Sequence, residues 1–141
     1  MRWARAPGVI YAALTPNLRR FAAAMAAGAD EVAVFAAASE GFSRANINCS
    51  IAESLDRFAL VRAAADAAKV RVRGYVSCVT DCPDDGPTPP EQVAQVAAAL
   101  VAMGCYSVSL GDAIGHATPE TTARMLDAVL ARVAAQRLAG C

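Results

Sequence analysis

The chain repeats one pattern four times along its 141 residues: a short β-prone run, a turn, a helix-start signal and an alanine-rich amphipathic stretch. The predicted helix starts are marked by Thr15, Ser50, Thr88 and Thr118. These residues recur at about the length of one βα unit, roughly 30 residues or more. Strands joined in this way run parallel with right-handed crossovers. The sequence therefore predicts an α/β fold built on a parallel sheet.

The predicted elements follow this pattern in order. Strands are expected at residues 9–11, 31–36, 70–78 and 106–110. Residues 39–48 are rich in Ser and Asn and are expected to form a loop, as are the turn-forming residues 81–86. Ser50 with Glu53 has the form of a capping box.

Two architectures fit parallel βα units. A doubly wound, flavodoxin-like sheet of four strands would be complete at this length, whereas a (β/α)₈ barrel typically needs about 250 residues. In the third strand, alternation places small and apolar residues on one face (Val70, Val72, Gly74, Val76 and Cys78) and polar ones on the other (Arg71, Arg73, Tyr75 and Ser77).

The fourth strand shows the same contrast, with Tyr106, Val108 and Leu110 predicted on the face opposite Ser107 and Ser109. A sheet covered by helices on both sides would not readily bury the polar faces. A barrel interior that opens on a substrate pocket would accommodate them. The patterning therefore favours the barrel.

Charge and composition exclude some functions. The 13 basic and 13 acidic side chains cancel, so nucleic acid is not expected as a partner. No apolar run approaches the roughly 20 residues needed to span a bilayer, and no signal-peptide pattern follows Met1. We expect a soluble, cytoplasmic protein without a membrane partner. The five cysteines are irregularly spaced and are expected to be free thiols.

Five segments, in order and spacing, closely resemble the hydroxymethylglutaryl-CoA lyases. They are residues 14–18 (Leu-Thr-Pro-Asn-Leu), 37–40 (Ala-Ala-Ser-Glu), 46–50 (Asn-Ile-Asn-Cys-Ser), 72–78 (Val-Arg-Gly-Tyr-Val-Ser-Cys) and 103–112 (Met-Gly-Cys-Tyr-Ser-Val-Ser-Leu-Gly-Asp). The resemblance extends from about residue 7 to residue 133. It implies a partial TIM (β/α)₈ barrel of four consecutive units, about the third to the sixth, so residues 1–141 are expected to be an incomplete barrel domain with two units before Met1 and two after Cys141.

The resemblance also implies an activity. Family members carry out a metal-assisted retro-Claisen cleavage of 3-hydroxy-3-methylglutaryl-CoA to acetyl-CoA and acetoacetate. A divalent cation, Mg²⁺ or Mn²⁺, is expected in the complete enzyme, with an acyl-CoA substrate and a possible homo-oligomer. The family's Arg-Asp and His-x-His metal motifs are not found in this chain. We therefore assign no metal ligand in this chain, and neither His116 nor the pair Cys78 and Cys82 is given that role. The isolated chain is expected to be inactive.

Two residues are candidates for catalysis. Asp112 follows directly on the last predicted strand, where barrel active sites lie, and matches an acidic residue of the family's site. Its structural alternative is to cap the turn at Gly115. Arg73 matches a position that lines the family's substrate cavity, and its alternative is a salt bridge in the barrel interior, to Asp112 or Glu40.

Four further residues are candidates for substrate binding. Tyr75 shares the inward face with Arg73, and Ser109 is inward-facing on the last strand. Asn46 and Ser50 lie at the end of the predicted loop, where their polar groups could bind acyl-chain or carboxylate oxygens. For Ser50, capping a helix is the main expected role.

Three alternative functions stay open on the sequence. The complete protein could be a related synthase or aldolase barrel, such as an isopropylmalate or homocitrate synthase. The half-barrel could bind acyl-CoA without catalysis. The chain could also be a non-functional fragment that aggregates through its open strand edges.

Overall fold

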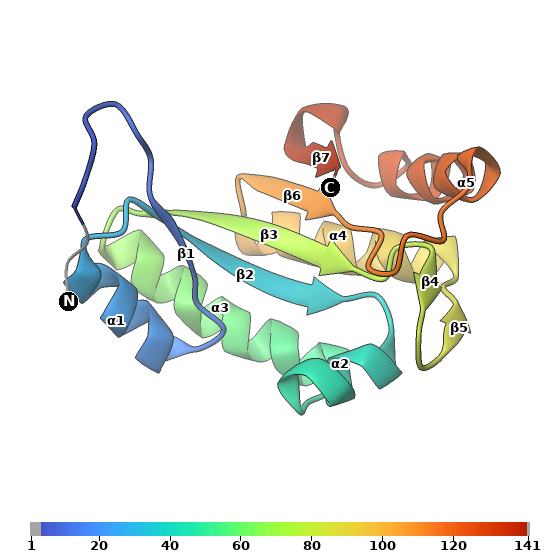
Figure 1. The fold of residues 1–141 in the computed structure, drawn as a ribbon, viewed down its shortest axis with the longest axis horizontal. Coiled ribbons are helices and arrows are strands. Elements are labelled where there is room, and N and C mark those ends of the chain that lie inside the picture. The colour runs from blue at the N-terminus through green and yellow to red at the C-terminus, as the bar shows by residue number, and fades with distance from the viewer. Residues whose placement is uncertain (1–3, 141) are drawn as a thin grey trace.

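The computed structural model describes residues 4–140 as an α/β fold around a five-stranded sheet (Figure 1). The strands of this sheet are β1 (Ala12–Leu14), β2 (Glu31–Ala37), β3 (Arg71–Ser77), β6 (Ser107–Leu110) and β7 (Leu138–Gly140). The helices are α1 (Leu18–Ala27), α2 (Glu40–Ile47), α3 (Ile51–Ala67), α4 (Pro90–Met103) and α5 (Pro119–Leu130), with a short 3₁₀ turn, η1 (Ala135–Arg137). No helix within residues 4–140 is long and apolar enough to cross a membrane.

The strand order decides between the two architectures. All neighbouring strands are parallel, in the order β1-β2-β3-β6-β7, which follows the chain without reversal. A doubly wound sheet reverses its order at a switch point. Helices α1, α3, α4 and α5 are also neighbours in chain order, as in the outer ring of a barrel. The sheet and its helices are therefore an arc of a barrel, as the strand patterning predicted.

Two predicted helix caps are confirmed and two are wrong. Ser50 and Thr118 each accept a hydrogen bond from the third residue of their helix within a capping box. Thr15 is fully buried and its amide continues the ladder to the carbonyl of Ala33, so Asn17 caps α1 in its place. The amide of Thr88 is likewise bonded to a backbone carbonyl, and α4 starts after Pro89 without a side-chain cap.

The predicted loop at residues 39–48 is largely the helix α2. Ser39 accepts a hydrogen bond from the amide of Phe42, and Glu40 lies in the first turn, where a negative charge favours the helix dipole. Asn48 ends the helix in the left-handed conformation, at φ 54°. The Ser and Asn residues that suggested a loop are thus the two caps of a short helix.

Three further boundaries differ from expectation. The first strand is residues 12–14 and not 9–11, and the fifth strand, β7, was not predicted. The expected loop at 81–86 contains an antiparallel hairpin of β4 (Asp81–Cys82) and β5 (Gly86–Pro87). Each missed element is two or three residues long, too short for a hydrophobic period to reveal.

The core lies between the sheet and the helices. In β3, Val72, Gly74 and Val76 are buried and alternate with partly exposed residues, which confirms the predicted apolar face. Gly74 is needed there because a Cβ at this position would lie 3.0 Å from Leu100 Cδ1 of α4. The four cysteines within the described residues are free and buried, as predicted, and Cys141 lies outside them.

Candidate active site on the inner face of the sheet

The face of the sheet opposite this core carries a row of polar side chains. Register pairs Glu31 of β2 with Arg71 of β3, and Tyr75 of β3 with Ser109 of β6. Because side chains alternate along strands, Glu31, Arg73, Tyr75 and Ser109 share this inner face. Three neighbouring strands therefore bring polar groups together on one surface.

Arg73 is at the centre of this row. Its Nη1 donates to Ser109 Oγ over 3.2 Å, its Nη2 donates to the Tyr106 hydroxyl over 3.1 Å, and its Nε lies 3.6 Å from Glu31 Oε1. The hydrogen bond to Tyr106 raises the pKa of Arg73 above its usual value. The structure thus joins the predicted residues Arg73 and Ser109. The expected salt bridge exists, but its partner is Glu31 and neither Asp112 nor Glu40.

Tyr106 departs from the sequence prediction. It was expected on the helix-facing side with Val108, yet its hydroxyl reaches the inner face and donates to Glu31 Oε1 over 2.7 Å. Tyr106 precedes the first residue of β6, so the alternation within the strand does not fix its direction. Burial, and the hydrogen bond to Glu31, raise the pKa of the Tyr106 hydroxyl.

Sequence reasoning missed Glu31 as a site residue. The sequence placed Glu31 inside a predicted strand, at an even number of residues from the other inward-facing positions of that strand. The missing information was the register between β2 and β3, which places its carboxylate beside two arginines. The register depends on how two strands pair in the folded protein, so the sequence of either strand alone does not determine it.

Tyr75 lies further along the same face. It lines a hollow of about 410 Å³ together with Leu14, Ala33, Phe35 and Ser77. Within the described part of the chain, its hydroxyl has no hydrogen-bond partner. The ring is therefore held by neighbouring strands while its polar end is free to meet a ligand.

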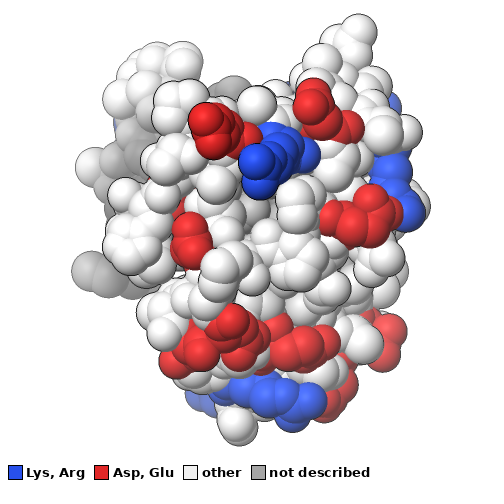
Figure 2. Space-filling view, turned by 90° about the vertical axis from the view of Figure 1, so that its right-hand side faces the viewer, with Lys and Arg blue, Asp and Glu red and all other residues white. Residues whose placement is uncertain are grey.

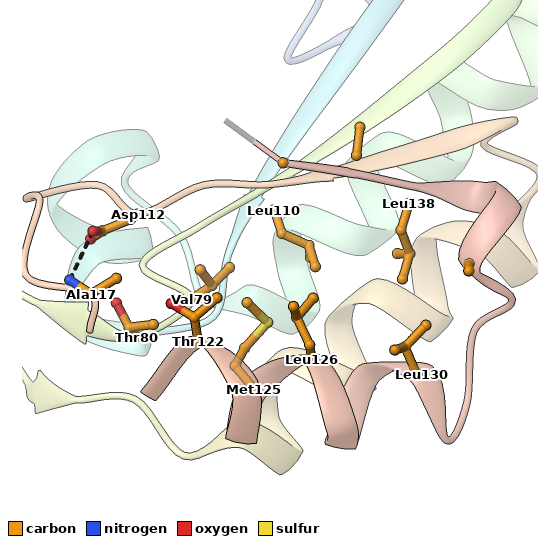
Figure 3. A pocket seen from close by; sticks show the side chains of 13 residues that line it. Val79, Thr80, Leu110, Asp112, Ala117, Thr122, Met125, Leu126, Leu130 and Leu138 are labelled. Atoms are coloured by element: carbon orange, nitrogen blue, oxygen red, sulfur yellow. Dashed lines mark hydrogen bonds between the residues drawn. The ribbon is translucent and has the colours of Figure 1, made fainter. Parts of the chain in front are cut away.

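Asp112 lies just beyond the carboxyl end of β6. Its carboxylate accepts a hydrogen bond from the amide of Gly115 over 3.1 Å and one from the amide of Ala117 over 2.9 Å, and Figure 3 shows the second of these. These backbone bonds, the one from Ala117 foremost, hold the pKa of Asp112 below its usual value. The structural alternative for Asp112, capping the turn at Gly115, is thus observed, and its role in an active site stays a prediction.

Asp112 also borders a hollow of about 510 Å³. This hollow lies between the helix side of β6 and β7 and helix α5. Figure 3 shows Leu110 and Leu138 of the sheet across from the side chains of α5 (Met125, Leu126 and Leu130). Its lining is almost wholly apolar, with Thr80, Asp112 and Thr122 as its polar residues.

Asn46 and Ser50 are not drawn into the network around Arg73. Asn46 is exposed on α2, and Ser50 caps α3 with Glu53. Helix α2, which carries Asn46, follows the carboxyl end of β2 (Figure 1), and this is the end of the strands where barrel active sites form. Their expected contact with a substrate stays a prediction, and the capping role of Ser50 is confirmed.

A second polar cluster ties the β4–β5 hairpin to α2. Ser39 Oγ lies 2.6 Å from Asp85 Oδ2 and 2.9 Å from Cys82 Sγ. Burial acts to raise the pKa of the Cys82 thiol, but hydrogen bonds from Ser39 and from two backbone amides lower it overall. Burial raises the pKa of Cys78 to about 12. The cluster fixes the loop at the carboxyl edge of the sheet.

The described residues do not fit a catalytic metal ion. Within residues 4–140, no three His, Cys, Asp or Glu side chains come together as ligands. Both oxygens of Asp112 already accept backbone hydrogen bonds, and His116 is exposed. On the face shown in Figure 2, acidic and basic side chains are interspersed and form no continuous basic surface.

Parallel strands in chain order, a layer of helices on one side and polar groups on the other define a segment of a (β/α) barrel with its inner face turned to a pocket. The family model described as HMGL-like matches residues 3–140, and the chain belongs to this family.

Named relatives agree with the family. A Pseudomonas aeruginosa protein, 3-hydroxy-3-isohexenylglutaryl-CoA/hydroxy-methylglutaryl-CoA lyase, is 60% identical over 134 residues, which are 95% of this chain and 45% of that protein. The Bos taurus mitochondrial hydroxymethylglutaryl-CoA lyase is 56% identical over 94% of this chain and 41% of its own length. The crystal structure of the HMG-CoA lyase from Brucella melitensis superposes with a TM-score of 0.95 at 57% identity, covering 97% of this chain and 48% of that one. The chain thus spans about half the length of these relatives.

Proposed function

We propose that this chain supplies the central βα units of a lyase that cleaves 3-hydroxy-3-methylglutaryl-CoA to acetyl-CoA and acetoacetate. Residues 1–141 would be an incomplete barrel domain, with units on both sides supplied from outside the chain. The observation that carries the proposal is the inner face, where the register of β3 with β6 brings Arg73 and Tyr75 together with Ser109, in a chain that is 60% identical to a lyase of this name. We propose acyl-CoA as the substrate partner. The complete enzyme is proposed to act in the cytoplasm and to form a homo-oligomer.

The reaction needs groups that the inner face can provide. A base takes the proton of the C3 hydroxyl, the C3 carbonyl of acetoacetate forms, and the electron pair of the C2–C3 bond passes to the thioester as an enolate. Protonation of that enolate at carbon gives acetyl-CoA. The N–H groups of Arg73 would stabilise the negative charge that develops on the thioester oxygen. Tyr75 and Ser109 would bind oxygens of the acyl chain.

Asp112, Asn46 and Ser50 would complete the pocket from the carboxyl edge of the sheet. Asp112 is the second proposed catalytic residue, and backbone hydrogen bonds, the one from Ala117 foremost, lower the pKa of its carboxyl group. A divalent cation, Mg²⁺ or Mn²⁺, would polarise the hydroxyl and carboxylate oxygens of the substrate when bound. The residues described here offer no site for it, so its ligands are proposed to come from the missing units.

The test is a hybrid enzyme, in which this chain replaces the matching 134 residues of the P. aeruginosa relative. The hybrid should cleave 3-hydroxy-3-methylglutaryl-CoA with Mg²⁺ or Mn²⁺, and the isolated chain should show no turnover. The intact relative is the positive control, and the hybrid with Arg73→Met is the negative one. A hybrid that melts cooperatively but does not cleave this substrate would contradict the proposal. Condensation of acetyl-CoA with an oxo acid would favour a synthase instead.

A further inference from the structure

We infer that Glu31 and Tyr106 are positioning residues that hold the guanidinium of Arg73 in one orientation, with its free N–H groups facing the barrel interior. The inference rests on the proposed function, because it assigns Arg73 to the substrate. Neither residue belongs to the set that the sequence indicated for the site.

Glu31 is a buried carboxylate with partners from two other parts of the sheet. Its side chain is 8% exposed. Its Oε1 accepts from the Tyr106 hydroxyl over 2.7 Å and lies 3.6 Å from Arg73 Nε, while its Oε2 lies 3.3 Å from Arg71 Nη2. A carboxylate this far from water needs such partners to stay charged. The Glu31 carboxylate is therefore held in place at the amino end of the strands.

Tyr106 connects this carboxylate to Arg73. Its hydroxyl accepts a hydrogen bond from Arg73 Nη2 over 3.1 Å and donates its own proton to Glu31. The guanidinium carbon of Arg73 also lies 5.3 Å from the centre of the Tyr106 ring, and that of Arg71 lies 4.5 Å from it. The ring thus restricts the Arg73 guanidinium at one face, and the hydroxyl restricts it at one edge.

A count of donors shows what is left for a substrate. A guanidinium carries five N–H groups in a planar fork. In Arg73, the Nε group faces Glu31, one group on Nη1 binds Ser109 and one on Nη2 binds Tyr106. One N–H on each terminal nitrogen has no partner among residues 4–140. These two groups can bind an oxyanion or a carboxylate of the substrate.

The contacts among Glu31, Tyr106 and Arg73 are better suited to orienting the Arg73 guanidinium than to stabilising the fold. A buried ion pair contributes little to stability compared with apolar residues of the same size, because desolvation offsets the attraction. Without Tyr106, Arg73 could turn its two terminal nitrogens to Glu31 as a paired fork and withdraw them from the pocket. The bridging hydroxyl occupies the Glu31 oxygen that this alternative would need.

The first experiment uses the hybrid enzyme with Tyr106→Phe, which removes the hydroxyl and keeps the ring, and with Glu31→Gln. Each variant should lower kcat about 10- to 100-fold, since a misplaced catalytic group costs up to about that factor, with a smaller change in KM and a cooperative melt. Tyr11→Phe, whose hydroxyl accepts from the amide of Ala6, and Glu120→Gln, in the first turn of α5, are the matched controls and should leave kcat unchanged.

The second experiment separates positioning from packing. In an Arg73→Gly hybrid, added guanidinium ion should restore part of the lost activity, because Glu31 and Tyr106 still form its binding place. Rescue should be at least several-fold weaker when Tyr106→Phe or Glu31→Gln is added. Equal rescue in all backgrounds, unchanged kcat in the single variants, or loss of the cooperative melt with Tyr106→Phe would each overturn the inference. An inactive unmutated hybrid would instead count against the proposed function.

Discussion

The two faces of the sheet are built from the same strands but differ in the side chains that they carry. Towards the helices, Val72 and Val76 of β3 are buried and pack with Leu100 of α4 in a continuous apolar core. Towards the inside, Arg73 and Tyr75 of the same strand are partly exposed and polar. The helix-covered face is packed with apolar side chains, and the inner face carries polar side chains.

This difference indicates that one face of the sheet contributes mainly to stability and the other mainly to function. Apolar burial stabilises a fold through area and close packing, and it needs no special chemistry. Polar groups on the inner face are arranged by hydrogen bonds across three strands, and some of their donors are left free. Substitutions on the first face should therefore reduce stability, and substitutions on the second should reduce activity.

The largest effect on stability is expected from Leu100→Ala. Leu100 is fully buried and contacts the face of β3 at Gly74. Truncation of a buried leucine removes buried area and leaves a cavity, which costs about 2–5 kcal/mol. Urea unfolding of the hybrid should show this loss, whereas Leu60→Ala, at an exposed site on α3, should change stability by well under about 1 kcal/mol. Equal effects of the two substitutions would break the comparison.

A smaller effect, dependent on pH, is expected at the carboxyl edge of the sheet. The Asp85 carboxylate accepts hydrogen bonds from Ser39 and from the amide of Gly41, and these lower its pKa. A carboxyl group with a lower pKa in the folded state contributes stability above its unfolded pKa of about 3.9, and this contribution is lost as the pH falls through the folded value. Apolar core residues such as Val72, Val76 and Leu100 have no carboxyl group and should not respond.

This expectation is checked by urea unfolding at pH 7 and pH 3. Asp85→Asn should lose stability at pH 7 and show a smaller further loss at pH 3 than the unmutated protein. Asp84→Asn, at an exposed neighbour whose side chain makes no such bonds, is the matched control and should keep the original pH dependence. The same pH dependence in both variants would show that Asp85 does not carry the effect.

The smallest effect on stability is expected from Tyr75→Phe. The Tyr75 hydroxyl bonds to no residue within 4–140, so its loss should change the free energy of unfolding by less than about 0.5 kcal/mol. The same variant of the hybrid should nevertheless cleave its substrate more slowly, because the hydroxyl is proposed to bind the acyl chain. Unchanged turnover would remove Tyr75 from the proposed site.

Local signals in the sequence were enough for much of the fold and for part of the site. Ser50 and Thr118 were found as caps because the capping pattern lies within a few residues. The two faces of β3 followed from alternation, which depends only on the strand itself. Parallel βα order followed from the repeat.

The rest depended on contacts between distant residues. Thr15 and Thr88 look like caps in sequence, but tertiary hydrogen bonds of their amides displace them from that role. Glu31 and Tyr106 are 75 residues apart, and only the pairing of strands brings them to Arg73. Sequence patterns could locate Arg73 and Ser109 on the inner face, but not the residues that orient them.

The central claim is that the inner face of this sheet binds the acyl chain of the substrate. The most direct test is a crystal structure of the hybrid enzyme with an unreactive thioether analogue of 3-hydroxy-3-methylglutaryl-CoA. The predicted result places oxygens of the acyl chain within hydrogen-bonding distance of the free N–H groups of Arg73 and of the Tyr75 hydroxyl. An analogue bound on the helix side, in the hollow between β7 and α5, with the inner face empty, would contradict the account.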